Sequence, residues 1–201
     1  IRTVRERGIL MQEAVPAGVG GMSAVLGMTA DEINAVVDEI PNVQVANYNC
    51  PGQIVISGLK EAVEIAAVKL KEAGARRVIP LNVSGPFHSY LLEEAGEKLG
   101  KFLENIPVAE PVIPYVANVT AAYVTKAEDV KPLLTRQVSS SVRWQQSVER
   151  MIADGVDTFI EIGPGRTLTG FLKKINKNVT GLHIEKVEEL EKVVRLLCDK
   201  Q

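Results

Sequence analysis

The sequence is poor in the residues from which metal sites, disulfide frameworks and aromatic base-stacking surfaces are built. Its 201 residues include 2 cysteines, 2 histidines and 1 tryptophan, and only 4% are aromatic. Cys50 and Cys198 lie far apart, outside any C-x-x-C or Cys/His spacing, so neither a disulfide framework nor a zinc site is expected. We therefore expect no cofactor and a reducing, cytoplasmic compartment.

Charge and hydropathy exclude two further classes of protein. The formal net charge is -2, which leaves no basic field to attract nucleic acid or anionic lipid. No apolar run approaches the roughly 20 residues that span a bilayer, and no signal-peptide pattern opens the chain. With 46% hydrophobic and 24% charged residues, the composition is that of one or two globular domains with a real core. Nucleic acid and membrane are thus not expected as partners.

Hydrophobic patterning in the first half of the chain predicts a small α+β unit. Strands are predicted at 22–27, 43–46, 54–57 and 76–83, and helices at 29–40 and 59–73. Thr29 and Glu32 have the spacing of a capping box, and the turn at Pro51 and Gly52 would join the middle strands in a hairpin. The order β-α-β-β-α-β is typical of a ferredoxin-like fold.

The second half shows longer α/β alternation. Helices are predicted over 91–103 and from about Asp129 and Trp144, and a strand interrupted by Pro114 is predicted at 112–116. A buried strand at 158–162 runs into Gly163-Pro164-Gly165 and a helix, and a last strand near Leu182 precedes a final helix. These patterns predict an α/β fold, in which the α+β unit is inserted into a larger α/β domain whose first part is absent.

Two residues are candidates for acid–base or anion chemistry, although their local context is ambiguous. His88 follows a predicted strand in a turn bent by glycine and proline, where a catalytic side chain or an ordinary surface histidine can lie. His183 lies in an apolar strand and is interpreted as structural. Arg7 could capture a carboxylate through its planar guanidinium, but an arginine on a charged helix is usually solvated or ion-paired.

Nucleotide and nucleophile motifs are missing. Gly163-Pro164-Gly165 lacks both the third glycine of G-x-G-x-x-G and the lysine of a P-loop, so a tight turn into a packed helix is the expected role. No G-x-S-x-G occurs, so no serine of this chain qualifies as the elbow nucleophile of a hydrolase-type site.

Five ordered motifs nevertheless carry a specific resemblance. They are Arg7-Gly8 with Met11-Gln12-Glu13-Ala14-Val15-Pro16, Asn47-Tyr48-Asn49-Cys50-Pro51-Gly52-Gln53, Val83-Ser84-Gly85-Pro86-Phe87-His88-Ser89, Val116-Ala117-Asn118-Val119 and Glu161-Ile162-Gly163-Pro164-Gly165. Together they resemble the bacterial malonyl-CoA:acyl-carrier-protein transacylases of type II fatty acid synthesis over essentially the whole chain. The resemblance implies a hydrolase-like α/β domain, incomplete here, built from residues 1–14 and 84–201, with a ferredoxin-like subdomain at 15–83.

The resemblance also implies a mechanism and site residues. In this family a serine takes the malonyl group from malonyl-CoA and passes it to the pantetheine thiol of acyl carrier protein, a ping-pong acyl transfer. His88 matches the family's acid–base histidine, and Gln137 matches the residue whose backbone carbonyl orients it. Arg7 matches the arginine that pairs with the malonyl carboxylate, and Phe87 matches a ring that excludes methylmalonyl. Asn49 and Asn118, which lie in two of the motifs, are assigned to substrate binding.

The serine nucleophile belongs to an N-terminal portion that the sequence does not include, so this chain alone is expected to be inactive. The restored full-length enzyme is expected to be a monomer. One alternative is an acyltransferase domain of a polyketide synthase. A second alternative is a noncatalytic binding module on the ferredoxin-like unit; its strands lack the aromatic pattern with which RNA-binding sheets stack bases.

Overall fold

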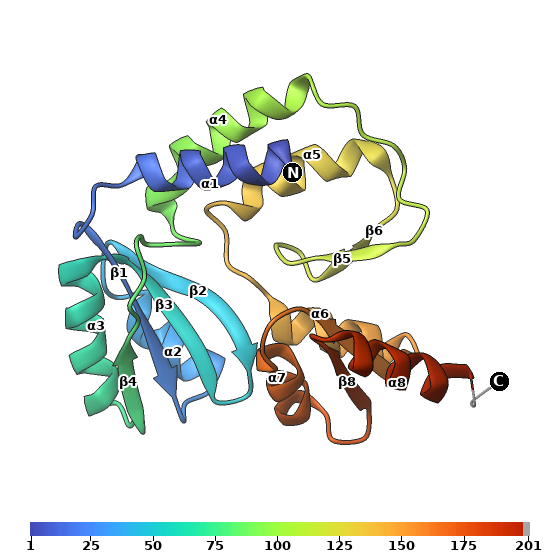
Figure 1. Cartoon of the computed structure of the whole chain (residues 1–201). Coiled ribbons are helices and arrows are strands. Elements are labelled where there is room, and N and C mark those ends of the chain that lie inside the picture. The colour runs from blue at the N-terminus through green and yellow to red at the C-terminus, as the bar shows by residue number, and fades with distance from the viewer. Residues whose placement is uncertain (199–201) are drawn as a thin grey trace. The chain divides into compact units, whose positions relative to one another are not determined.

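The computed structural model describes residues 1–198 and contains two compact units, Ile1–Ser147 and Val148–Gln201 (Figure 1). Helix α6 (Trp144–Ala153) contains the boundary between them. The expected subdomain boundaries at 14/15 and 83/84 do not coincide with this division and stay a prediction. No helix among residues 1–198 is both long enough and apolar enough to cross a membrane.

The first unit contains a four-stranded antiparallel sheet with two helices. Its elements are β1 (Gly20–Leu26), α2 (Ala30–Val37), β2 (Val43–Cys50), β3 (Gln53–Leu59), α3 (Lys60–Glu72) and β4 (Arg77–Pro80). The strand order is β2-β3-β1-β4, and β3 pairs with both β1 and β2. The predicted ferredoxin-like order and the hairpin at Pro51 and Gly52 are confirmed, and β2 extends four residues beyond its predicted end.

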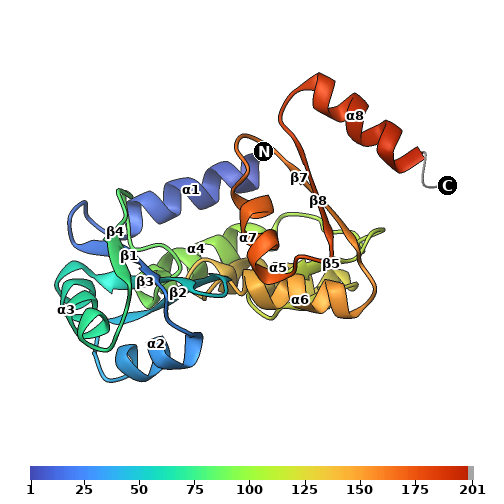
Figure 2. The same ribbon diagram turned by 90° about the horizontal axis from the view of Figure 1, so that it is seen from below.

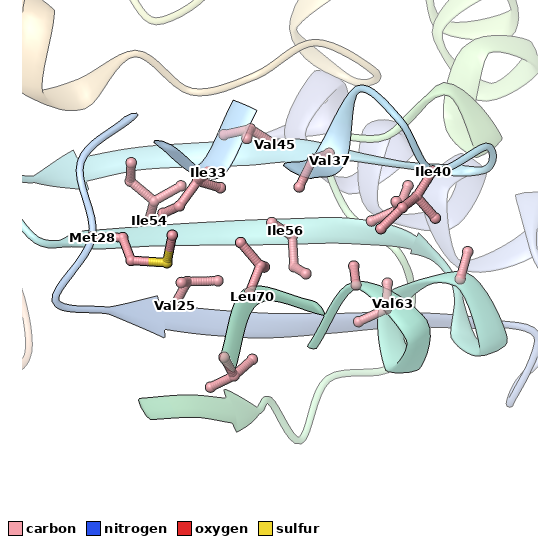
Figure 3. Packing of buried hydrophobic residues seen from close by; sticks show 14 residues of the cluster. Val25, Met28, Ile33, Val37, Ile40, Val45, Ile54, Ile56, Val63 and Leu70 are labelled. Atoms are coloured by element: carbon pink, nitrogen blue, oxygen red, sulfur yellow. The ribbon is translucent and has the colours of Figure 1, made fainter. Parts of the chain in front are cut away.

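Alternating side chains place two different layers on the two faces of this sheet. One face packs against α2 and α3, which lie on the same side of the strands (Figure 2). Figure 3 shows Val25 of β1 and Ile56 of β3 meeting Ile33 of α2 and Leu70 of α3. All four side chains are fully buried, and each contributes about 1.5–3 kcal/mol of hydrophobic stabilisation. The predicted capping box at Thr29 is also present and starts α2.

The opposite face carries a smaller apolar cluster that supports the functional loop. Met22 and Ala24 of β1 lie on this face with Val55 of β3, because neighbouring residues in a strand point to opposite sides. Leu81 and Phe87, from the segment after β4, pack against them. The sheet therefore positions the loop that contains His88.

Three further helices belong to the first unit. They are α1 (Arg2–Ala14), α4 (Glu93–Glu104) and α5 (Ala127–Gln137), and a short 3₁₀ turn, η1 (Tyr90–Leu92), precedes α4. Their shared core includes Met11 of α1 and Leu99 of α4. The helices α4 and α5 approach closely because α4 presents glycine at the contact: a Cβ on Gly96 would lie 3.0 Å from the Thr135 carbonyl oxygen. This contact places the end of α5.

The predicted strand at 76–83 is shorter in the structure, where β4 ends at Pro80, and the predicted strand at 112–116 is largely wrong, while its partner β6 is an additional strand. The segment predicted as a strand at 112–116 is irregular until Tyr115, where β5 (Tyr115–Ala117) begins and pairs with β6 (Ala122–Val124). Pro114 cannot donate to a strand ladder, and Val112 is 98% exposed, so its hydrophobicity reflects no burial. The tight turn before β6 contains Ala121 at φ 53°, a conformation that alanine does not signal in sequence.

The second unit holds β7 (Thr158–Ile162), α7 (Thr167–Ile175), β8 (Thr180–Ile184) and α8 (Val187–Cys198). β7 and β8 pair in parallel, as expected for strands joined by a helix. The Glu161 carboxylate accepts hydrogen bonds from the backbone N–H groups of Leu168, at 3.0 Å, and Thr169, at 2.7 Å. The protein's own carboxylate thus occupies the N-terminus of α7, which supports the structural interpretation of Gly163-Pro164-Gly165.

Candidate functional site

The imidazole of His88 contacts a backbone carbonyl at the end of α5. His88 lies between β4 and η1, and its Nδ1 is 3.0 Å from the carbonyl oxygen of Gln137. A carbonyl can only accept, so in the neutral ring the proton resides on Nδ1 and Nε2 carries a lone pair. The structure therefore fixes the tautomer that is able to accept a proton at Nε2.

Several contacts hold the loop around His88. A Cβ on Gly20 would overlap the ring of Pro86, so only glycine at the start of β1 allows the loop to approach this closely. Ser89 is fully buried and donates its hydroxyl proton to the Pro86 carbonyl at 2.7 Å. His88 itself has φ 58°, a left-handed conformation that is uncommon for a side chain other than glycine.

Gln137 joins the imidazole to the candidate carboxylate-binding residue. Its side-chain Oε1 accepts a hydrogen bond of 2.8 Å from Nη2 of Arg7 on α1, while its backbone oxygen faces His88. One residue at the last position of α5 therefore contacts both candidates. Within residues 1–198 no carboxylate pairs with Arg7, so the guanidinium keeps donors for an external anion.

The electrostatics of the site favour a neutral imidazole beside a cation. Burial lowers the pKa of His88 below its ordinary 6.5, and the charge of Arg7 lowers it further. Hydrogen bonds to the backbone of Gln137 and Ser140 act in the opposite direction but do not offset the burial. Burial also lowers the pKa of the Arg7 guanidinium, which nevertheless remains charged at any physiological pH.

These residues face a cavity of about 490 Å³, in the size range of small-molecule sites. Arg7, Gly8, Met11 and Gln12 line it from α1, where residues four apart, Arg7 with Met11 and Gly8 with Gln12, share a side of the helix. The remaining lining comes from the sheet and the His88 loop: Met22, Asn47, Leu81, Val83, Phe87 and His88. A charged group, a neutral base and apolar walls thus converge on one space.

Three of the six predicted site residues, Arg7, Phe87 and His88, line the cavity, and Gln137 lies against two of them. In the described part of the chain, Asn49 and Asn118 are not among its lining residues. A bulge between Tyr48 and Cys50 interrupts the pairing of β2 at Asn49 and separates it from Asn47, which does line the cavity. The binding roles of Asn49 and Asn118 stay predictions.

The sequence does not indicate either Asn47 or Met22 as a site residue. Asn47 belongs to one of the five motifs, but a regular strand would place it on the same face as Asn49, and no bulge signal distinguishes the two. Met22 looked like an ordinary buried residue of β1, and it is 6% exposed. The detectable signal was on α1, where Met11 and Gln12 follow Arg7 and Gly8 at helical spacing.

The second histidine and the metal-ligating side chains give no competing site. His183 on β8 contacts the Gly163 carbonyl oxygen through Nε2 at 3.0 Å, as expected for a structural role. Among residues 1–198 no group of three or more His, Cys, Asp or Glu side chains could hold a metal ion. The candidate site thus consists of an imidazole, a guanidinium and a cavity, and the sequence contains no G-x-S-x-G serine elbow.

Comparison with known proteins relates this chain to acyltransferases. The sequence model described as the acyl transferase domain matches residues 1–194. The malonyl CoA-acyl carrier protein transacylase of Bacillus subtilis is 46% identical over 204 residues, an alignment that covers 100% of this chain and 64% of the relative. This chain thus spans a little under two thirds of the relative's length.

Solved structures agree with the sequence relatives. The malonyl CoA-acyl carrier protein transacylase of Clostridium perfringens superposes with a TM-score of 0.94 at 44% identity, over 99% of this chain and 64% of that one. A malonyl-transacylase solved in complex with its type II PKS acyl-carrier protein superposes with a TM-score of 0.94 at 40% identity, over 96% of this chain and 64% of that one. The hydrolase-like α/β class with a ferredoxin-like subdomain is thereby confirmed, and the chain belongs to the acyl transferase domain family.

Proposed function

We propose that this chain forms the acid–base and carboxylate-binding part of an enzyme that transfers a malonyl group from malonyl-CoA to the pantetheine thiol of acyl carrier protein. The observation that carries the proposal is the double contact of Gln137, which holds the His88 imidazole by its backbone and the Arg7 guanidinium by its side chain. The names of the sequence relatives support the same activity.

The proposed reaction uses His88 twice. A serine from the family's elbow segment, which this sequence does not contain, attacks the malonyl thioester carbonyl while Nε2 of His88 takes the hydroxyl proton. The tetrahedral intermediate collapses to malonyl-serine, and the resulting imidazolium returns the proton to the departing CoA thiolate. The second half-reaction repeats these steps with the pantetheine thiol as the attacking group, so the enzyme ends unchanged.

Gln137 contributes to this reaction without carrying charge. Its carbonyl stabilises the imidazolium through the Nδ1 proton, as an aspartate does in a Ser-His-Asp triad, but it does so as a neutral dipole. A carboxylate at this place would raise the pKa of His88 and would also compete with malonate for Arg7. A neutral acceptor is therefore compatible with an anionic substrate.

Arg7 selects the acyl group in this proposal. The free carboxylate of the malonyl group binds the guanidinium in a bidentate manner, whereas an acetyl group leaves the half-buried cation unpaired. Phe87 lines the same cavity and limits the space beside the acyl chain, which disfavours methylmalonyl. Malonyl-CoA and acyl carrier protein are the proposed partners, no cofactor is expected, and the proposed compartment is the cytoplasm.

The same proposal assigns residues 1–14 and 84–201 to the larger acyltransferase domain and 15–83 to the ferredoxin-like subdomain. A monomer is expected for the complete enzyme. The four-stranded sheet with its two helices lies within the range of the proposed subdomain. Helices α1, α4 and α5, which carry or position Arg7 and Gln137, lie within the proposed larger domain.

The experiment joins this chain to the serine-bearing segment of the Bacillus subtilis relative. The fusion is incubated with malonyl-CoA and pantetheine-bearing acyl carrier protein, and intact mass spectrometry follows malonyl-enzyme and malonyl carrier protein. We expect both species with the wild-type sequence and neither with His88→Ala, while the complete Bacillus subtilis protein serves as positive control. A fusion that is folded by circular dichroism but acquires no malonyl group would overturn the proposal.

A further inference from the structure

A glutamine on the sheet, outside the cavity, contacts the backbone of two segments: the loop that contains His88 and the segment that follows Gln137. Gln44 lies on β2, where it pairs with Ser57 of β3. Its neighbours Val43 and Val45 face the core beneath α2 and α3, so the Gln44 side chain points to the opposite face, toward the His88 loop.

The amide of Gln44 hydrogen-bonds to three main-chain groups. Its Oε1 accepts a hydrogen bond of 3.0 Å from the backbone N–H of Tyr90, and its Nε2 donates to the carbonyl oxygens of His88 at 3.2 Å and Ser139 at 3.4 Å. These partners assign the amide orientation, because the flipped amide would set its oxygen against two carbonyls and its NH₂ against an N–H.

We propose that Gln44 is a positioning residue for His88, through an amide that clamps the histidine loop and the Gln137 segment at the spacing of the Nδ1 contact. Ser139 is two residues beyond Gln137, whose carbonyl faces Nδ1 at 3.0 Å. The donor loop and the acceptor segment of that contact are therefore both bonded to one side chain. This inference rests on the proposed function, in which His88 is the base.

The backbone conformation of His88 explains why such a clamp is needed. With φ 58° the residue occupies a left-handed conformation that local sterics disfavour, so surrounding contacts must stabilise it. Gln44 bonds two main-chain groups that follow this strained dihedral. They are the carbonyl of His88 itself and the N–H of Tyr90, which comes after the intervening Ser89. Without the amide, relaxation toward an ordinary φ would rotate the imidazole away from Gln137.

The clamp adds no charge beside the base. Gln44 is neutral, and the charged group that acts on His88 is Arg7, which lowers its pKa. The residue can therefore fix geometry without opposing the neutral state of the imidazole. Its effect should appear in the tautomer of His88 and in kcat, and not in the binding of substrate.

The test uses Gln44→Met, which keeps the length of the side chain and removes both hydrogen-bonding groups. The matched control is Tyr90→Phe, which removes the hydroxyl bond from the same loop to Asn42 at 3.0 Å and leaves the Gln44 contacts in place. In the 201-residue chain, long-range ¹⁵N–¹H spectra of the two imidazoles report the His88 tautomer, and His183 provides the internal reference.

We expect a single Nδ1–H tautomer for His88 in the wild type and in Tyr90→Phe, and a mixture in Gln44→Met. In the serine-bearing fusion we expect Gln44→Met to lower kcat for malonyl transfer about 10- to 100-fold, with KM within about twofold, as for a displaced catalytic group. If Gln44→Met reduces thermal stability strongly, Gln44→Asn keeps a neutral amide that is one methylene too short to bond both segments, and should give the same mixture.

An unchanged tautomer together with an unchanged kcat would refute the positioning role. If Gln44→Met gives a mixed tautomer but the wild-type fusion transfers no malonyl group, Gln44 remains the clamp and the proposed function is rejected. The spectra and the kinetics thus separate the two proposals.

Discussion

The tightness of the contact between α4 and α5 can be tested by adding one methyl group there and measuring the change in the free energy of unfolding. In an exposed helix position, Gly→Ala stabilises by about 0.8–1.0 kcal/mol because alanine has the higher helix propensity. At Gly96, however, the new Cβ lies 3.0 Å from the Thr135 carbonyl oxygen, which is backbone and cannot swing aside. Gly8 of α1 is the matched control in the same unit, since a Cβ there meets no atom within 4 Å.

The magnitude follows from the difference between these two sites. Overpacking costs typically 1–3 kcal/mol, so Gly96→Ala should be neutral or up to about 2 kcal/mol less stable than the wild type. Gly8→Ala should be about 1 kcal/mol more stable. The two variants then differ by about 1–3 kcal/mol, which is the cost of the contact itself because the propensity gain cancels.

Urea unfolding followed by the fluorescence of the only tryptophan measures this difference. Trp144 belongs to the first unit, which also contains both glycines, so the signal reports the transition of interest. The same Gly96→Ala chain should show a disturbed His88 tautomer, because Thr135 is two residues before Gln137. Equal free energies of unfolding for the two alanine variants would show that α4 and α5 do not meet as tightly as described.

Three further outcomes are expected. Arg7→Ala in the serine-bearing fusion should lower kcat/KM for malonyl transfer by about 10- to 150-fold without lowering acetyl transfer, because a charge-assisted hydrogen bond contributes about 1.5–3 kcal/mol. As the control, Arg5→Ala, an exposed position on the same helix, should leave the ratio of malonyl to acetyl kcat/KM unchanged. Because burial lowers the pKa of His88, the unfolded chain binds the imidazole proton more tightly than the folded chain does. The free energy of unfolding, measured in urea, should therefore fall more steeply below pH 6.5 in the wild type than in His88→Gln. Equal slopes of this free energy against pH would contradict the lowered pKa. Glu161→Gln should speed up hydrogen exchange at the backbone amides of Leu168 and Thr169, which donate to this carboxylate, and unaltered exchange rates would argue against the carboxylate cap.

Most of the fold could be predicted from the sequence because its strands and helices carry strong periodicity. The short apolar runs around Val25 and Ile56 indicate buried strands, and the helical spacing through Leu70 indicates one buried helix face. The structure buries both faces of these strands and that face of the helix. The failure at 112–116 has a physical cause: hydrophobic residues there flank Pro114 and stay exposed. The hairpin partner β6 depends on a positive φ at Ala121, for which composition offers no signal.

The site was predictable only as separate residues. Helical spacing could place Arg7 with Met11, but nothing in the local sequence indicates that Gln137, 130 residues further on, contacts Arg7 by its side chain and His88 by its backbone. Backbone acceptors carry no residue-type signature, so the contact to His88 was inferred through family resemblance. Gln44 was missed for a similar reason, because all three of its partners are main-chain groups.

The outer edge of β2 is not left open. The segment between α5 and α6 forms a single parallel bridge to it, with hydrogen bonds from Val142 N–H to the Ala46 carbonyl at 2.8 Å and from Tyr48 N–H to the Val142 carbonyl at 2.9 Å. Val142 follows Gln137 by five residues. An opening event that breaks this bridge would release the amide protons of Val142 and Tyr48 together and would loosen the carbonyl that orients His88. The hydrogen-exchange rate of these two amides should therefore measure how often the segment opens and the His88 imidazole loses its alignment.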